Sequence, residues 1–333
     1  MKRVGFLMPF ICSLENLHEA FLRASKGKSG KLAVIDFRTH LEENLLRMGY
    51  QLQNGTFQFG QYNFFTIYDP KRRVICAASF PERVAFHAIM RICHPVFDDF
   101  QISDSYASRI GKGTYKALER AMDYCRRYKW FAKIDVRKYF DSIRHEILLR
   151  QLCRLYKDPI LLTYFRDLID GYEVEKGRGL PIGNLTSQYF ANHYLAVADH
   201  YAREHLHQHA VMRYMDDILL FDNDLSRLKK ILGSLADFIR KVLMLELHPP
   251  IVNKTKFGVP FLGYVVYANR MRLNGRSRKR FIHKMANLSY QLALENIDEK
   301  EYVERATCLM AFIDKADCQN LKRQLAQMQG MYP

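Results

Sequence analysis

The sequence contains no cysteine pair at Cys-x-x-Cys spacing and no apolar run that approaches the ~18 residues a membrane-spanning helix needs. Its seven cysteines are scattered along the chain, a pattern typical of reduced thiols in a cytoplasm. Pro9 interrupts the apolar residues 4–12, so we expect no secretory signal peptide. The sequence therefore predicts a cytoplasmic chain that does not cross a membrane.

A phosphate-binding P-loop, internal repeats and low-complexity tracts are also missing. The loop at residues 25–31 is rich in glycine and lysine, but it lacks the Gly-x₄-Gly-Lys-Ser/Thr pattern and a preceding strand. With 333 residues the chain can bury a large core. Apolar residues at three-to-four spacing predict helices at about 12–50, 81–97, 114–128, 144–156, 159–170 and 225–243.

Acidic residues are scarce relative to basic ones. The 51 Lys and Arg residues outnumber the 35 Asp and Glu residues, which gives a net charge of +16. A charge of this size favours a polyanionic partner, because basic side chains neutralise phosphates and release counterions. The block from Arg270 to Lys284 contains no acidic residue, so it either contacts a nucleic-acid backbone or stays solvated.

Two adjacent acidic residues stand between two short apolar runs at residues 211–221. The flanking β-branched and aromatic residues predict strands, and Asp216-Asp217 falls where a hairpin would turn. Such a turn holds both carboxylates at one point, which suits hard cations such as Mg²⁺. A solvated hairpin tip is the alternative, because aspartate is common in turns.

A second carboxylate, Asp135, ends a predicted strand in the segment 131–143. A turn and a helix start follow it, and the connection to Asp216 is long enough to return the chain to a neighbouring strand. Two-metal phosphoryl transfer needs this arrangement, because carboxylates from separate strands hold two cations about 4 Å apart. Asp135, Asp216 and Asp217 are therefore the candidate catalytic residues.

At these residues the sequence resembles reverse transcriptases: residues 131–143 resemble their first palm motif, and Tyr-Met-Asp-Asp at 214–217 their Tyr-x-Asp-Asp box. A third motif lies between them at 179–188, where Gly183 permits a tight backbone approach to a nucleotide. Most reverse transcriptases carry Gln-Gly-x-x-x-Ser-Pro there. Ile182-Gly183 and Ser187-Gln188 instead resemble the enzymes of diversity-generating retroelements. Further similar segments, at 13–17, 105–114 and 261–264, extend the resemblance over nearly the whole chain.

The resemblance implies an α+β fold of the right-hand polymerase type. Fingers and palm would interleave over residues 1–265, and a helical thumb would occupy 266–333. Within the first part we expect N-terminal helices at about 12–50, a fingers hairpin at about 60–75 and the palm motifs at about 128–265. From this length we expect no added RNase H, protease or endonuclease domain.

The resemblance also implies a role for each motif residue. Asp135 and Asp216 would bind two Mg²⁺ ions, supported by Asp217 and the backbone of Val136. Predicted contacts to the incoming nucleotide and primer come from substrate-binding residues in all the motifs: Lys71, Arg73, Val136, Tyr139, Ile182, Gly183, Gln188, Tyr214 and Met215. Among these, Lys71 and Arg73 would grip the triphosphate and Tyr139 would exclude a ribose 2′-OH. Lys254 is the candidate general acid, and a plain loop lysine is its alternative.

The implied activity is RNA-directed DNA polymerisation that makes error-prone cDNA from a template-repeat RNA. The implied partners are template RNA, primer or cDNA, dNTPs and a small, basic, barrel-forming accessory variability determinant protein. Such systems are bacterial or phage-encoded, and their errors concentrate at template adenine. Ile182 supports looser selection on physical grounds, because it lacks the amide of the usual Gln, a contact commonly worth about 1 kcal/mol.

Three alternatives stay open. A retron or group II intron reverse transcriptase shares the chemistry, but would be expected to carry Gln-Gly and Ser-Pro at positions 182–183 and 187–188. A catalytically silent RNA-binding scaffold is disfavoured, because clustered acids repel one another unless they bind a metal. A phage-defence polymerase that needs no template is the third.

Overall fold

The computed structural model describes residues 2–68 and 72–318. Lys71, which was predicted to bind the triphosphate, lies outside these residues. The helices in the first half are α1 (Met8–Ile11), α2 (Leu14–Ser25), α3 (Leu32–Thr39), α4 (Leu41–Gln53), α5 (Phe80–Phe100), α6 (Thr114–Arg127), α7 (Tyr139–Ser142), α8 (His145–Leu155) and α9 (Pro159–Asp170). They are followed by α10 (Leu185–His200), the π-helix η1 (Tyr201–His205), α11 (Leu225–Lys241), the 3₁₀ helix η2 (Thr255–Phe257), α12 (Gly275–Ala293) and α13 (Glu299–Asp314).

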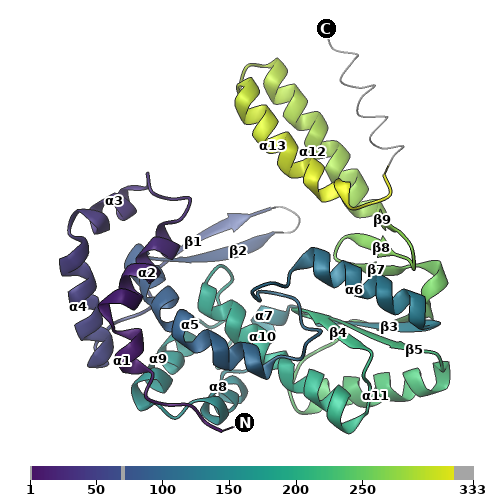
Figure 1. The fold of residues 1–333 in the computed structure, drawn as a ribbon, viewed down its shortest axis with the longest axis horizontal. Coiled ribbons are helices and arrows are strands. Elements are labelled where there is room, and N and C mark those ends of the chain that lie inside the picture. Colours follow the sequence, from purple (N-terminus) through teal and green to yellow (C-terminus); the bar gives the residue numbers. More distant parts are fainter. Residues whose placement is uncertain (1, 69–71, 319–333) are drawn as a thin grey trace.

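The strands form three antiparallel sheets (Figure 1). A hairpin is formed by β1 (Tyr62–Ile67) and β2 (Arg73–Ala78). The central sheet has the order β4-β5-β3-β6, with β3 (Trp130–Asp135), β4 (Val211–Tyr214), β5 (Asp217–Asp222) and β6 (Ile251–Lys254). A third sheet contains β7 (Val259–Phe261), β8 (Tyr264–Val266) and β9 (Met271–Leu273). The prediction of a mixed helix-and-sheet fold with an antiparallel sheet is confirmed.

The central sheet is covered on both faces. Ala132, Ile134 and Ile218 belong to a core shared with α10 and α11, whereas Phe131 and Leu219 belong to a core shared with α6 and β7–β8. Side chains alternate between the two faces of a strand. Lys133, Asp135 and Asp217 therefore lie on the α6 face, in phase with Phe131 and Leu219.

Helices α1–α5 pack together at one end of the molecule, beside the β1–β2 hairpin (Figure 1). Ser79 and Glu82 form a reciprocal capping box that begins α5, and Glu82 also accepts hydrogen bonds from Gly60 and Gln61. A buried carboxylate thus joins the start of this long helix to the start of the hairpin. The predicted helical region at 12–50 is interrupted at residues 26–31, as expected, and also at His40.

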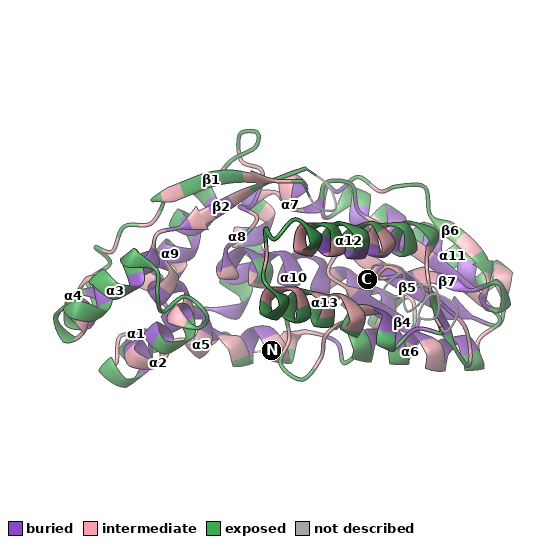
Figure 2. Cartoon of the chain, turned by 90° about the horizontal axis from the view of Figure 1, so that it is seen from above, coloured by how far each residue is buried: buried purple, intermediate pink, exposed green. Residues whose placement is uncertain are grey.

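Residues 259–314 form the third sheet and the helix pair α12–α13, whose small core contains Phe281, Met285 and Ile313. The third sheet continues across the predicted fingers–palm and thumb boundary at 265/266, because β8 spans it. Buried residues are concentrated in the central strands and α10, whereas α12 and α13 are largely exposed (Figure 2). Within residues 2–68 and 72–318, no helix combines the length and apolarity needed to cross a membrane.

Candidate active site

The three predicted carboxylates come together at one end of the central sheet. Asp135 is the last residue of β3 and lies directly opposite Asp217, the first residue of β5. Tyr214 is paired with Asp217, so Met215 and Asp216 form the two-residue turn between β4 and β5. Opposite residues of an antiparallel pair have Cα atoms roughly 5 Å apart. The sheet register therefore converts two distant sequence motifs into one acidic cluster.

Lys133 offsets part of this negative charge. Its Nζ lies 2.8 Å from Oδ1 of Asp217, and both side chains are largely shielded from solvent. Burial is the main cause that raises the pKa of Asp216 to about 6; the charges of Asp217 and Asp135 add to this rise, and Lys133 opposes it. Burial also raises the pKa of Asp217, again opposed by Lys133. The three carboxylates of the cluster thus carry more negative charge than Lys133 neutralises.

A divalent cation fits the chemistry of this cluster. Its donors are hard carboxylate oxygens, and a cation would relieve the repulsion that raises the pKa of Asp216. Across residues 2–68 and 72–318, no three His, Cys, Asp or Glu side chains already converge as a ready metal site. One of the three carboxylates, Asp217, contacts Lys133 instead.

The backbone of Val136 faces the cluster. The carbonyl of Asp135 accepts from His248, and the amide of Arg137 donates to Glu246, so these two bonds flank Val136. Because its two neighbours make these bonds, the N–H and C=O of Val136 itself point away from the strand that carries Glu246 and His248. The peptide groups of Val136 are therefore directed to the β5 side, which is compatible with its predicted role as a metal ligand.

The turn that carries Asp216 is strained at Met215, whose φ of 55° is in the left-handed region. A two-residue hairpin turn of this kind requires positive φ, usually supplied by Gly or Asn. Tyr214, just before the turn, is half-buried, and its hydroxyl is 3.1 Å from Thr114 Oγ1 at the start of α6. Both flanks of the turn are thus held by other elements.

The loop with Ile182 and Gly183 packs against the β1–β2 hairpin. The Ile182 carbonyl accepts a hydrogen bond of 2.8 Å from the Cys76 amide on β2. Gly183 has φ of 120°, and a Cβ there would lie 2.9 Å from the Cys76 carbonyl oxygen. The close approach that requires glycine here is to β2, and the predicted approach of a nucleotide to Gly183 stays a prediction. Gln188 is exposed and accepts a hydrogen bond from the Ser108 hydroxyl.

Tyr139 does not offer an aromatic face to a nucleotide. Its side chain is only 4% exposed, and its hydroxyl donates to the Ala191 carbonyl on α10. Burial therefore argues against the predicted role in excluding a 2′-OH. The next residue, Phe140, is half-buried and has its ring centroid 5.9 Å from that of Tyr139. Of the two aromatic residues in this motif, Phe140 is the one whose side chain is partly exposed to solvent.

Lys254 lies at the wrong end of the sheet for a general acid. On β6 it is opposite Trp130, the first residue of β3, and its Nζ lies over the Trp130 ring, 5.1 Å from the centroid. Asp135 is five residues further along β3, about 17 Å away at ~3.3 Å per residue. The prediction for Lys254 is corrected, because strand register separates it from the carboxylates.

The remaining predicted contacts lie on exposed surfaces. Arg73 is exposed at the start of β2. The basic block 270–284 is divided between β9 and the first half of α12, where Arg276 and Arg278 are exposed. No acidic residue occupies the first turn of α12, although a helix N-terminus favours negative charge. Helix stability therefore does not explain these cations.

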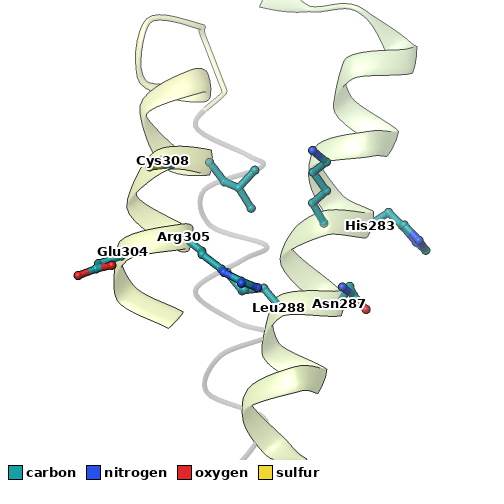
Figure 3. A pocket seen from close by; sticks show the side chains of 8 residues that line it. His283, Asn287, Leu288, Glu304, Arg305 and Cys308 are labelled. Atoms are coloured by element: carbon teal, nitrogen blue, oxygen red, sulfur yellow. The ribbon is translucent and has the colours of Figure 1, made fainter. Parts of the chain in front are cut away.

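A groove of about 760 Å³ lies between α12 and α13. Figure 3 shows Arg305 extending from α13 towards Leu288 on α12, while Glu304 and His283 point away from the gap. The groove is lined by residues of both helices: His283, Lys284, Asn287, Leu288, Glu304, Arg305, Cys308 and Leu309. It belongs to the helix pair and not to the acidic cluster.

Two charged residues near the cluster, Lys133 and Arg213, were assigned no role from the sequence. Lys133 precedes Asp135 by two residues, so strand alternation alone puts both on one face. Arg213 interrupts an apolar strand immediately before the acidic turn, and it is fully buried beside Asp199. A cation inside an apolar run is the signal that marks both positions, because a buried charge needs a partner.

Comparisons with known proteins agree with this geometry. The model of the family described as "Reverse transcriptase (RNA-dependent DNA polymerase)" matches residues 70–266. A yeast protein, the "Putative COX1/OXI3 intron 1 protein" of Saccharomyces cerevisiae, is 23% identical over 171 residues, which cover 49% of this chain and 20% of the yeast protein.

Two solved structures are similar in fold. A telomerase from Candida albicans has a TM-score of 0.50 at 14% identity and covers 73% of this chain and 52% of its own. A Candida tropicalis telomerase without bound partner has a TM-score of 0.51 at 10% identity, and the coverages are 67% and 50%. The chain thus spans a fifth of the yeast protein and about half of each telomerase.

Proposed function

Since the chain belongs to the reverse transcriptase (RNA-dependent DNA polymerase) family, we propose that it extends a primer on an RNA template with dNTPs. The observation that carries this proposal is the register of the central sheet. It sets Asp135 opposite Asp217 and next to the turn with Asp216. Nucleotidyl transfer needs such a convergence of carboxylates from separate strands. The net charge of +16 suits a nucleic-acid substrate.

Divalent metal ions would be held by Asp135 and Asp216, with the Val136 backbone beside them, and Mg²⁺ is the proposed ion. When bound, such ions stabilise the attacking and leaving oxygens of a phosphoryl transfer. The protein's own residues supply the rest. Asp217 binds Lys133, which limits repulsion within the cluster, and the β4–β5 turn holds Asp216 at the end of the sheet.

Replacing Asp216 with Asn tests the proposal. The change keeps the shape of the side chain but removes a charged ligand, so template-dependent dNTP incorporation should fall to background in a folded protein. Asp237→Asn, on the exposed surface of α11, is the matched control and should retain normal activity. Normal primer extension by the Asp216 variant would reject the site. Circular dichroism and thermal unfolding would check the fold of both variants.

A finer function is proposed from the Ile182 motif: error-prone cDNA synthesis of the diversity-generating retroelement type, with a small basic accessory protein as partner. Ile182 is half-buried, and its carbonyl is bonded to Cys76. The backbone of this position is therefore held in place, while its side chain cannot hydrogen-bond to a nucleotide or primer end. A missing polar contact lowers discrimination between correct and incorrect pairs.

Sequencing of cDNA made from a defined RNA tests this finer function. Errors should concentrate opposite template adenine, with or without an accessory protein, and Ile182→Gln should reduce them. Val242→Gln adds the same amide at an exposed position after α11 and should leave the error spectrum unchanged. Errors spread evenly over the four bases would remove the retroelement proposal and leave the polymerase proposal intact.

The yeast match favours a second candidate, an intron-encoded type of reverse transcriptase. Such an enzyme would copy its RNA accurately and would show no adenine preference. The same sequencing experiment therefore separates the two candidates, since both predict primer extension and only one predicts base-specific errors.

A further inference from the structure

Arg213 on β4 is completely buried and directly precedes the turn with Asp216. Nη1 of its guanidinium donates to the Met215 carbonyl at 2.9 Å. The other groups that accept from the guanidinium are the Asp199 carboxylate at 2.7 Å, the Asn192 side chain at 2.8 Å, the Asn192 carbonyl at 3.1 Å, the Gln101 side chain at 2.9 Å and the Ser105 hydroxyl at 3.4 Å. One cation therefore joins the turn to α10, to the end of α5 and to Ser105.

The bond to Met215 bears directly on Asp216. The Met215 carbonyl belongs to the peptide that joins Met215 to Asp216, so fixing its oxygen fixes the orientation of that peptide. Met215 is in the left-handed region, with φ of 55°, which is unfavourable for a residue that carries a Cβ. A conformation of this kind persists when its surroundings hold it in place. Arg213 supplies such a restraint from inside the protein.

The opposite side of the guanidinium is anchored to the body of the fold. Asn192 and Asp199 lie on α10, and Gln101 is the C-cap residue of α5. The Arg213 backbone is bonded as well, since its amide donates to the Asp104 carbonyl and its carbonyl accepts from Tyr106. α10 packs against both α5 and β4. The turn is thus linked to both α10 and α5.

The geometry of the ion pair indicates what the arginine is used for. Nε of Arg213 meets only Oδ2 of Asp199, and Asp199 Oδ1 has no hydrogen-bond partner among the described residues. A bidentate pair would be the stronger arrangement for two buried charges. Here the two Nη groups are instead distributed to Met215, Asn192 and Gln101. The ion pair of Arg213 with Asp199 is therefore weaker than a bidentate pair, but the guanidinium also holds the turn through Met215.

We propose that Arg213 is a positioning residue for the reaction: it holds the Met215 carbonyl and thereby sets Asp216 relative to α10 and α5. The proposal rests on the function proposed above, in which Asp216 binds a catalytic metal ion. It predicts that loosening this arginine lowers the rate of nucleotide transfer more than it lowers nucleotide binding.

Arg213→Lys is the first test, because lysine keeps the charge for Asp199 but cannot also reach Met215 and Gln101. In steady-state primer extension, kcat should fall roughly tenfold to a hundredfold, since small misplacements of a reacting group have effects of this size. The KM for dNTP should change less than about threefold, and half-maximal activity should need more Mg²⁺. Thermal unfolding is measured alongside.

Asp199→Asn is the matched comparison, because it weakens the ion pair and leaves the bond to Met215 in place. At similar loss of thermal stability, it should lower kcat far less than Arg213→Lys. Rates that fall in proportion to stability in both variants would overturn the proposal and leave Arg213 with a structural role only.

If Arg213→Lys does not fold, Gln101→Met removes one anchor of the guanidinium without touching the turn. It should lower kcat several-fold at unchanged KM and raise the Mg²⁺ requirement; an unchanged kcat would overturn the proposal. Failure of the underlying function looks different. In that case the wild-type protein does not polymerise, or Asp216→Asn polymerises normally, whereas the Arg213 proposal fails only in an active, Asp216-dependent enzyme.

Discussion

One buried residue on α10, His193, makes the stability of the fold depend on pH. His193 is 1% exposed, lies against Phe97 and Phe100, and its Nδ1 lacks a hydrogen-bond partner among the described residues. Burial, together with the charges of Arg213 and His200, lowers the pKa of His193 from 6.5 to about 3. The native state therefore holds this imidazole neutral, while the unfolded chain protonates it below pH 6.5.

We predict that this histidine makes the fold acid-labile. Its contribution to stability is complete above pH 6.5 and declines as pH falls towards 3, by up to about 1.4 kcal/mol per pH unit. In urea unfolding between pH 4.5 and 7, His193→Gln should show a shallower dependence of unfolding free energy on pH, by nearly one proton. His283→Gln, an exposed control on α12, should not. Equal slopes in all three proteins would contradict the prediction.

The two neighbouring aromatics after Asp135 give a second prediction at this scale. Phe140 is half-buried whereas Tyr139 is enclosed and bonded to α10, so Phe140→Val should raise ribonucleotide incorporation by roughly tenfold or more. Tyr139→Phe should instead lower stability by about 1–2 kcal/mol, because it removes the buried hydrogen bond from the Tyr139 hydroxyl to the Ala191 carbonyl. Competition between dNTP and rNTP in primer extension gives the discrimination ratio. An unchanged ratio for Phe140→Val would return the role to Tyr139.

Among the secondary-structure elements, local patterns were good predictors and long-range pairing was not. The spacing of apolar residues predicted α5, α6, α8, α9 and α11 to within a few residues, because helix periodicity is a local property. The position of Lys254 could not be predicted this way, because it depends on β6 pairing with β3. The partner of Gly183 is equally non-local, since β2 lies more than a hundred residues earlier in the chain. Asp135 and Asp216 were predictable because their motifs imply neighbouring strands.

The contact between β2 and the Ile182–Gly183 loop predicts a strong effect for a small change. A Cβ at Gly183 would lie 2.9 Å from both the Cys76 carbonyl oxygen and Ile75 Cγ2, at a φ of 120° that only glycine adopts readily. Gly183→Ala should therefore destabilise the protein by roughly 2–4 kcal/mol. Gly233→Ala is the control, because that glycine is exposed on α11 with nothing within 4 Å of a new Cβ.

The control should be neutral or stabilising by up to about 1 kcal/mol, since alanine is the better helix former. Chemical denaturation of the three proteins compares their unfolding free energies. Two alanine variants of equal stability would show that the loop does not depend on its close approach to β2.

At the scale of the whole molecule, some of the exposed positive charges lie where the protein's own structure does not favour them. The central sheet lies between α11 on one face and the α6 side on the other, and α12–α13 stand beyond β9 on the side away from α11 (Figure 1). Arg276 and Arg278 are exposed in the first turn of α12, where cations oppose the helix dipole. An unfavourable local placement of this kind points to a binding partner that compensates for it.

We therefore predict that these cations contact nucleic-acid phosphates. Replacing Arg276, Arg278 and Arg280 with Gln should weaken template–primer binding equally for all sequences, because phosphate contacts carry no base information. If all three contact phosphates, the slope of log K against log salt concentration should become shallower by about 2–3. Fluorescence anisotropy over a range of salt concentrations measures both effects.

The matched control removes three lysines from the opposite side of the molecule, on α11: Lys229, Lys230 and Lys241. It changes the net charge by the same amount, so a similar loss of slope in both variants would mean that total charge, not this surface, governs binding.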